Sequence, residues 1–210
     1  MGHQKIKVEV GMFTLSAFLS YVIAVTFSPG PNNLMSMISS SKSGYRKTLP
    51  FIMGVTTGFF FLVMVSTYFN RGLFALVPQF QIGMKILGSL YMSYLALKIM
   101  GIDVIGILSH KKTTKNFQVL YGFKAGMILQ FINPKAILYA LTVVSAYVVP
   151  YYSTHTHYLL FSIFLAFMAF LSNTTWALFG QFLNRFISKY EKQFNSVMAF
   201  LLLYSAYALW

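Results

Sequence analysis

Long apolar stretches, separated by short polar segments, make up almost the whole chain. They cover six approximate ranges: Met12–Ser28 (continuing to Ile38), Leu49–Phe69, Ile82–Met100, Gly122–Val149, Tyr158–Phe182 and Phe194–Trp210. A helix needs about 20 predominantly apolar residues to cross a bilayer. The pattern therefore predicts an all-α integral membrane protein with six transmembrane helices.

Two of these stretches contain a helix-breaking segment. The first is interrupted by Ser28-Pro29-Gly30-Pro31-Asn32-Asn33, and the fourth by Asn133-Pro134-Lys135, about half a chain length later. Proline lacks the backbone N–H and clashes with the preceding turn, so each segment breaks its helix. In hydrocarbon, a broken backbone survives only where protein or a water-filled cavity supplies hydrogen-bond partners. Paired breaks in two halves indicate a transporter's substrate site, whereas a simple kink relieved by neighbouring helices is the alternative.

The spacing of the breaks and the number of spans predict two halves, whose sequence similarity is faint. Half-repeats of approximately 12–101 and 119–210 contain three spans each, and residues 1–11 form a polar N-terminal extension, with Met12 as an alternative start. Because three is odd, the second half enters the membrane from the opposite face. The expected architecture is two inverted three-helix repeats whose broken first and fourth helices face each other.

Composition and charge agree with a membrane protein and set its orientation. The chain is 57% apolar and 9% charged, with a mean hydropathy of +0.66. In a soluble protein, a net charge of +13 would suggest a nucleic-acid partner. Here the basic residues lie mostly between apolar spans, where they set the topology, so no nucleic-acid partner is expected. Nine bases follow spans one, three and five: Lys42, Arg46, Lys47, Lys111, Lys112, Lys115, Arg185, Lys189 and Lys192. The other side carries three, Lys5, Lys7 and Arg71, so both termini are expected outside.

The first break supplies hydrogen-bond donors. A new helix that starts at Pro31 leaves its first N–H groups without partners inside the helix, at its positive pole. The N–H groups of Asn32, Asn33 and Leu34 are therefore candidates to bind a carboxylate.

Lys135 is the strongest single candidate for a residue of the substrate site. Placing a lysine near the centre of a membrane helix costs about 2.5–3.5 kcal/mol on insertion scales. The three acidic residues, Glu9, Asp103 and Glu191, lie in terminal or loop segments. The Lys135 ammonium therefore needs an anionic ligand, carbonyl dipoles or water, unless it extends to the nearer interface. Lys85, near the beginning of its span, is interpreted as such an interface residue.

Several other polar or small residues allow more than one interpretation. Asn173, Thr174 and Thr175 lie in the middle of the fifth span, where they either bond neighbouring helices or line a substrate path. Two small-residue motifs, Gly54-x-x-x-Gly58 and Gly122-x-x-x-Gly126, predict close helix packing. His155-Thr156-His157 is interpreted as part of a solvated loop rather than a metal site. We find no nucleophile–base pair and no phosphate-binding loop, so the chain is not expected to be an enzyme or to hold a metal or cofactor.

The motifs in both halves resemble those of the LysE/RhtB family of amino-acid exporters. The similar segments are Phe27–Asn33, Gly44-Tyr45-Arg46, Gly54-x-x-x-Gly58, Lys85-x-x-Gly88-x-x-Tyr91-x-x-Tyr94-x-Ala96 and Asn133-Pro134-Lys135. Three further segments resemble the cysteine/O-acetylserine branch of that family: Leu129–Asn133, Asn173–Leu178 and Asn195–Tyr204.

The resemblance implies a secondary transporter in the bacterial inner membrane. It would export small neutral amino acids or derivatives, such as cysteine or O-acetylserine, by proton antiport. Three alternatives remain open: export of threonine, homoserine, leucine or basic amino acids; export of divalent cations; and a non-transporting assembly role. The expected partners are the amino acid, the lipid bilayer and, as a candidate, a second copy of the chain. The predicted substrate-binding residues are Pro29, Gly30, Pro31, Asn32, Asn33, Asn133, Pro134, Lys135, Asn173 and Thr174.

Overall fold

The computed structural model describes residues 14–101, 122–184 and 189–207, without the side chains of 71–81, 84 and 87. The regular elements of these ranges are all α-helices. They are α1 (Leu15–Phe27), α2 (Pro31–Ser43), α3 (Tyr45–Tyr68), α4 (Asn70–Ile99), α6 (Phe123–Ile132), α7 (Pro134–Tyr147), α8 (His155–Phe182) and α10 (Glu191–Tyr207). The prediction of an all-α chain is confirmed for this part of the molecule.

Both predicted breaks lie where the prolines are. Helix α1 ends at Phe27 and α2 begins at Pro31, with Gly30 extended between them (φ −175°). Helices α6 and α7 meet at Asn133, and their axes differ in direction by 66°. A proline opens the second helix of each pair, where the absent N–H costs no helical hydrogen bond.

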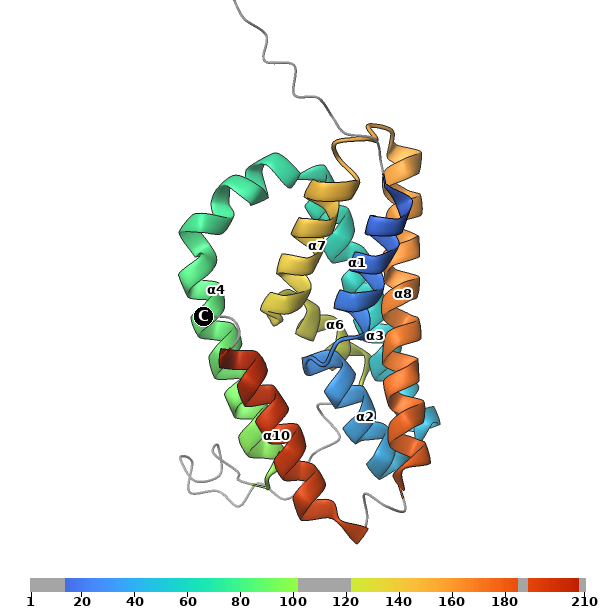
Figure 1. Cartoon of the computed structure of the whole chain (residues 1–210), viewed down its shortest axis with the longest axis vertical. Coiled ribbons are helices and arrows are strands. Elements are labelled where there is room, and N and C mark those ends of the chain that lie inside the picture. The colour runs from blue at the N-terminus through green and yellow to red at the C-terminus, as the bar shows by residue number, and fades with distance from the viewer. Residues whose placement is uncertain (1–13, 102–121, 185–188, 208–210) are drawn as a thin grey trace, which may run out of the picture.

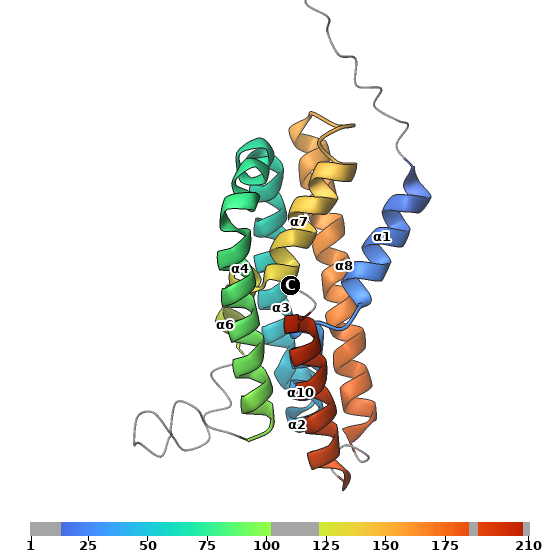
Figure 2. The same cartoon turned by 60° about the vertical axis from the view of Figure 1, so that its left-hand side comes forward.

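The helices form an elongated bundle in which the breaks lie near mid-height. Helices α3 and α8 run its full height, α1 and α7 occupy the upper half, and α2 and α10 the lower half (Figure 1). Helix α3 packs on α6 and α8, α2 packs on α8, and α4 packs on α10. Turned by 60°, the bundle shows α1 diverging from α8 toward its upper end (Figure 2).

Two apolar cores lie on either side of the breaks. The first is built from α2, α3, α4, α6 and α10, and it includes Leu34, Ile38, Phe51, Leu95 and Leu202. The second is built from α1, α3, α7 and α8, and it includes Phe18, Val22, Phe59, Val143 and Leu165. The broken backbone therefore lies between two packed layers, which hold its ends in place.

Glycines bring helix backbones into direct contact in the lower half of the bundle. A Cβ on Gly54 would lie 2.0 Å from the Phe123 carbonyl oxygen, and one on Gly126 would lie 2.2 Å from that of Phe51. Gly180 of α8 approaches the Met37 carbonyl of α2 in the same way, at 2.2 Å. The predicted close packing is confirmed for Gly54, Gly58 and Gly126. It is wrong for Gly122, which precedes α6 and has nothing within 4 Å of an added Cβ.

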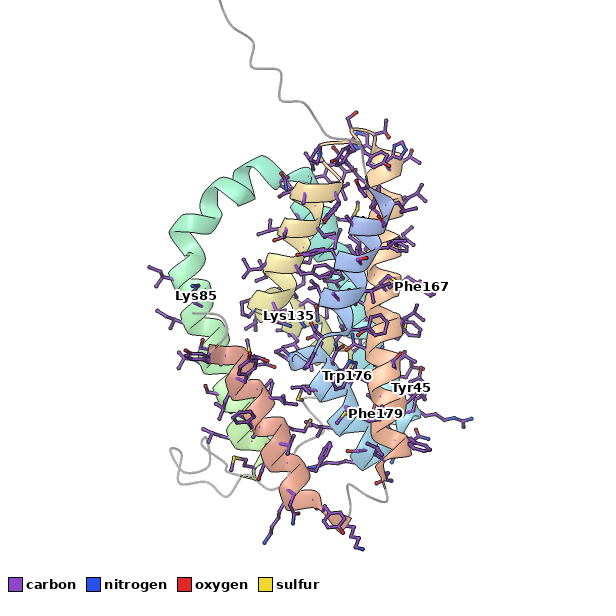
Figure 3. The ribbon with its side chains drawn as sticks, in the orientation of Figure 1. Tyr45, Lys85, Lys135, Phe167, Trp176 and Phe179 are labelled. Carbon is purple, nitrogen blue, oxygen red and sulfur yellow. The ribbon has the colours of Figure 1, made fainter. Side chains whose placement is uncertain are left out.

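The surface of the bundle is apolar, as expected of a membrane protein. Helices α3 and α8 are each long and apolar enough to cross a bilayer, and the bent pair α6–α7 adds a third span if it crosses as one unit. Large apolar side chains on α8 are exposed, including Leu160, Ile163, Phe167 and Phe179. Phe167 lies at the outer edge of α8 in Figure 3. Such a surface suits contact with lipid tails.

Three sequence-based details differ from the structure or lie beyond it. Helix α4 begins at Asn70 rather than Ile82, so Lys85 lies near its middle and not near its beginning. Glu191 opens α10 rather than lying in a loop, and its carboxylate is 3.6 Å from the Lys42 ammonium. The extension 1–11, Met12 and Asp103 lie outside the described residues.

Candidate functional site

The break between α1 and α2 interrupts the helical hydrogen-bond pattern, so the backbone carbonyl groups of this segment lack their usual helical partners. Every backbone carbonyl from Ala24 to Gly30 nevertheless accepts a hydrogen bond, either from a nearby backbone N–H or from a side chain. Ser172 Oγ donates to Thr26 O at 2.8 Å, and Trp176 Nε1 donates to Phe27 O at 3.2 Å. Helix α8 therefore stabilises the break by replacing helical bonds with side-chain donors.

Lys135 completes this set from the second half of the chain. Its Nζ donates to Ser28 O at 3.0 Å, Ser28 Oγ at 2.8 Å and Pro29 O at 3.2 Å. The residue lies in the first turn of α7, where the helix dipole disfavours a cation, but its ammonium reaches the negative, carboxyl-terminal end of α1. Lys135 lies at mid-height beside the break in Figure 3. Of the sequence-based alternatives, carbonyl dipoles are confirmed as its partners, and extension to the interface is wrong.

Side-chain amides join the two breaks directly. Asn32 Nδ2 donates to Gln130 Oε1 at 3.2 Å, and Asn133 Nδ2 donates to Asn32 Oδ1 at 3.2 Å. Asn133 Oδ1 in turn accepts from the Lys135 backbone N–H at 3.1 Å, which caps α7. One amide from α2 is thus held between two amides of the α6–α7 break.

A cavity of about 50 Å³ lies against this crossing of the breaks. Its lining combines amides, hydroxyls and one ammonium with apolar and aromatic walls from α1, α2, α3, α6, α7 and α8. The lining residues are Val25, Thr26, Gly30, Pro31, Asn32, Asn33, Phe59, Gln130, Asn133, Lys135, Ala136, Tyr139, Ala169 and Asn173. We call this cavity the polar chamber.

A second, larger cavity of about 480 Å³ adjoins the polar chamber. It lies between α1, α4, α7 and α10, and its walls include Tyr21, Pro29, Met92, Thr142 and Tyr204. Four residues line both cavities and therefore separate them: Val25, Pro31, Lys135 and Tyr139. The larger cavity therefore borders the polar chamber across these four side chains.

Most of the predicted site residues meet at the polar chamber. Seven line it, namely Gly30, Pro31, Asn32, Asn33, Asn133, Lys135 and Asn173. Pro29 lines the larger cavity, whereas Pro134 packs against Gly88, whose added Cβ would lie 2.2 Å from the Pro134 ring. Thr174 lines neither cavity, and its buried hydroxyl has no partner among the described residues.

The structure also answers two points that the sequence left open. Asn173 both lines the polar chamber and joins helices, because its Oδ1 accepts from Ser36 Oγ at 2.9 Å. The Leu34 N–H is not available to a ligand, since it donates to Gly30 O at 2.9 Å. The N–H groups of Asn32 and Asn33 have no backbone or side-chain acceptor in the described part of the chain.

Sequence reasoning missed three polar residues of the polar chamber, Thr26, Gln130 and Tyr139. Gln130 lies one helical turn before Asn133 and is only 1% exposed, and Thr26 bonds Tyr139 through their hydroxyls at 3.0 Å. Gln130 could have been found by the rule that singled out Asn173, because both are amides inside an apolar stretch. Nothing in the sequence pattern indicates that Thr26 and Tyr139 meet.

The chemistry of the lining excludes several kinds of site. Among the described residues that line either cavity there is no carboxylate, and Lys135 is the one charged group. A search of the described residues finds no group of three His, Asp or Glu side chains that could hold a metal ion. His155 instead pairs its Nδ1 with the Tyr68 hydroxyl at 2.8 Å. The polar chamber therefore suits a small polar solute better than a divalent cation.

Helices broken at the same depth around a polar chamber, in a bundle with an apolar surface, define a membrane translocator. Comparison with known proteins assigns the family. The LysE type translocator model matches residues 23–210, so the chain belongs to the LysE type translocator family. It is accordingly a multi-pass transporter of the inner membrane and not an enzyme.

Curated relatives cover nearly the same length. A cysteine/O-acetylserine efflux protein of Klebsiella pneumoniae is 32% identical over 193 residues, which are 91% of this chain and 94% of the relative. The protein of that name from Escherichia coli K12 is 30% identical over 192 residues, 91% of this chain and 95% of the relative. No solved structure matches the chain.

Proposed function

We propose that this protein exports a small neutral amino acid, with cysteine and O-acetylserine as the leading candidates. The observation that carries the proposal is the polar chamber, where the two breaks meet around uncharged amides, hydroxyls and a single lysine. The similarity to efflux proteins named for cysteine and O-acetylserine supports the same choice.

The charge of the chamber favours a neutral substrate. A lysine or arginine substrate would bring a second positive charge beside Lys135, where the described lining offers no carboxylate to balance it. Desolvating such a pair would be costly. Size acts in the same direction, because a chamber of about 50 Å³ holds only about four water molecules. Small polar amino acids therefore fit better than basic or bulky ones.

Transport would follow from an inverted-repeat architecture. In this proposal α1–α2 and α6–α7 are equivalent broken spans, the six spans form two inverted halves within residues 12–210, and both termini lie outside. The supporting observations are the two proline breaks and the side-chain contacts between them. Proton antiport would drive export, although the described lining provides no carboxylate to carry the proton.

Efflux from loaded cells tests the proposal. Cells with and without the protein are loaded with radiolabelled cysteine, O-acetylserine, threonine, leucine or lysine, and loss of label is followed over time. We expect expression to accelerate the loss of cysteine or O-acetylserine most strongly. Preferred export of lysine would contradict the charge argument, and no acceleration with any of the five would contradict the proposed function.

A further inference from the structure

Gln130 carries a buried side-chain donor that the hydrogen-bond network of the polar chamber leaves without a partner. Its side chain is 1% exposed, and its Nε2 has no partner among the described residues. A buried donor without a partner costs about 1–3 kcal/mol. Because Gln130 also lines the polar chamber, this donor is placed to bind a ligand there.

The direction of the amide chain shows that the unpaired group is a donor. A backbone N–H can only donate, so the Lys135 N–H fixes Asn133 Oδ1 as an acceptor. Asn133 must then donate through Nδ2 to Asn32, and Asn32 through Nδ2 to Gln130 Oε1. Gln130 is the last amide in this series of hydrogen bonds, and its free group is therefore the NH₂. The series itself fixes which atom of each amide is nitrogen and which is oxygen, an assignment that is otherwise ambiguous.

A second set of donors lies on the same chamber. Helix α2 begins at Pro31, which has no N–H, and the N–H groups of Asn32 and Asn33 follow it without acceptors in the described residues. Both residues line the polar chamber, and their N–H groups lie at the positive pole of a 13-residue helix. The Lys135 side chain adds positive charge to the same wall.

The carbonyl acceptors of the first break, unlike these donors, already have hydrogen-bond partners. The carbonyls from Ala24 to Gly30 already accept hydrogen bonds, those of Ser28 and Pro29 from the Lys135 ammonium. The open hydrogen-bonding capacity of this wall thus comes from donors, which favours an anionic group.

We propose that the polar chamber is a carboxylate subsite in which Gln130 Nε2 and the N–H groups of Asn32 and Asn33 bind the α-carboxylate of the transported amino acid. This inference rests on the proposed function and assigns one end of its substrate. Gln130 is then a specificity-determining residue, because its free N–H donor can bind a carboxylate but not an ammonium group.

Competition in proteoliposomes tests the inference with the unmodified protein. Export of radiolabelled cysteine is measured with excess unlabelled 3-mercaptopropionate, which keeps the carboxylate, or cysteamine, which keeps only the ammonium. We expect inhibition by 3-mercaptopropionate and at least about tenfold weaker inhibition by cysteamine, as one charge-assisted hydrogen bond would give. Equal inhibition by the two, or stronger inhibition by cysteamine, would overturn the carboxylate subsite.

Substitutions at Gln130 provide the second arm. Gln130→Met removes the donor, and Gln130→Glu keeps the acceptor for Asn32 but places oxygen where the free NH₂ was. We expect both to lower cysteine export by about tenfold or more. Gln181→Glu is the matched control, because this glutamine is exposed and, among the described residues, its side chain bonds the Tyr45 N–H through its oxygen at 2.7 Å, outside both cavities. Export at the wild-type rate by both Gln130 variants would overturn the proposal.

A binding measurement separates this inference from the proposed function. In detergent, 3-mercaptopropionate should raise the thermal midpoint of the wild-type protein and leave that of Gln130→Met unchanged. If the wild type bound 3-mercaptopropionate in this way but exported no cysteine, the proposed substrate would fail and the carboxylate subsite would stand. If cysteine were exported and neither protein were stabilised, the subsite would fail alone.

Discussion

At the scale of single residues, Lys135 connects the two halves of the molecule. Its ammonium binds Ser28 and Pro29, more than a hundred residues earlier in the chain, and it lines both cavities. Among the described residues that line these cavities it is the only charged one. The Lys135 ammonium thus supplies hydrogen-bond donors to the carbonyl groups of the first break, and these carbonyl groups in turn stabilise its positive charge.

Lys135→Met is expected to abolish most export while the protein still folds. The substitution leaves the Pro29 carbonyl without a donor, at about 1–3 kcal/mol. It also removes a cation whose insertion costs about 2.5–3.5 kcal/mol, so the net change in stability is small. Cysteine efflux and the thermal midpoint in detergent measure the two effects. Lys85→Met on α4 is the matched control, and equal export by both variants would contradict the role of Lys135.

Single residues also show what a sequence can and cannot predict. A lysine and four asparagines stand out inside apolar stretches, because burying their polar groups is costly. All five line the polar chamber, together with Gly30 and Pro31 of the first break. Gln130 gives a weaker signal, and its role depends on meeting Asn32 from the other half. Such a meeting is decided by packing between helices, which a single sequence does not reveal.

At the scale of helices, glycine contacts set how closely α3 and α6 approach. Gly54→Ala would place a methyl group 2.0 Å from the Phe123 carbonyl oxygen, and this contact involves backbone that no side-chain rotation relieves. We expect the free energy of unfolding to fall by about 1–3 kcal/mol or more. The thermal midpoint in detergent reports this change.

Gly83→Ala is the control for that substitution. It adds the same methyl group inside helix α4, where nothing lies within 4 Å. Alanine is favoured over glycine in a helix by about 1 kcal/mol, so this variant should be unchanged or slightly more stable. Equal destabilisation of the two variants would contradict the packing argument.

The first break itself is open to a helix-scale test. Pro29→Ala combined with Pro31→Ala restores two N–H groups and permits α1 to continue into α2. A continuous helix would pair the N–H groups of Asn32 and Asn33 internally, and the donors of the polar chamber would be lost. We expect normal membrane insertion with little export, measured by membrane fractionation and cysteine efflux. Export at the wild-type rate would show that the break serves only the architecture.

Proline made these breaks predictable, whereas helix length was less so. Both second helices begin at the expected prolines, Pro31 and Pro134. The start of α4 was misplaced because residues 70–81 include Asn70, Arg71, Pro78 and two glutamines, which lower the hydropathy without preventing a helix. Apolar stretches predict the part of a helix that suits hydrocarbon, and a helix can extend beyond it.

At the scale of the whole molecule, orientation is the first property to test. The carboxyl-terminal ends of α2, α4 and α8 all lie at the lower end of the bundle in Figure 1. Basic residues follow these ends in the sequence, nine against three on the other side. The positive-inside rule therefore predicts that the lower end is cytoplasmic. A reporter active only in the periplasm should be active when fused after Trp210 and silent within Lys111–Lys115; the reverse result would contradict the inverted arrangement.

The position of Lys135 has an electrical consequence. Moving one elementary charge through the full membrane potential changes its energy by about 2.3 kcal/mol per 100 mV. In the proposed inverted-repeat transporter, access to the polar chamber would alternate between the two sides. Water would then reach the Lys135 ammonium from opposite faces in turn, and the charge would cross part of the field even if it hardly moved. We expect a voltage step to produce a transient current in reconstituted membranes, and Lys135→Met to abolish it. The membrane potential would then set how often this translocator faces each side, even though the amino acid that we propose it carries has no net charge.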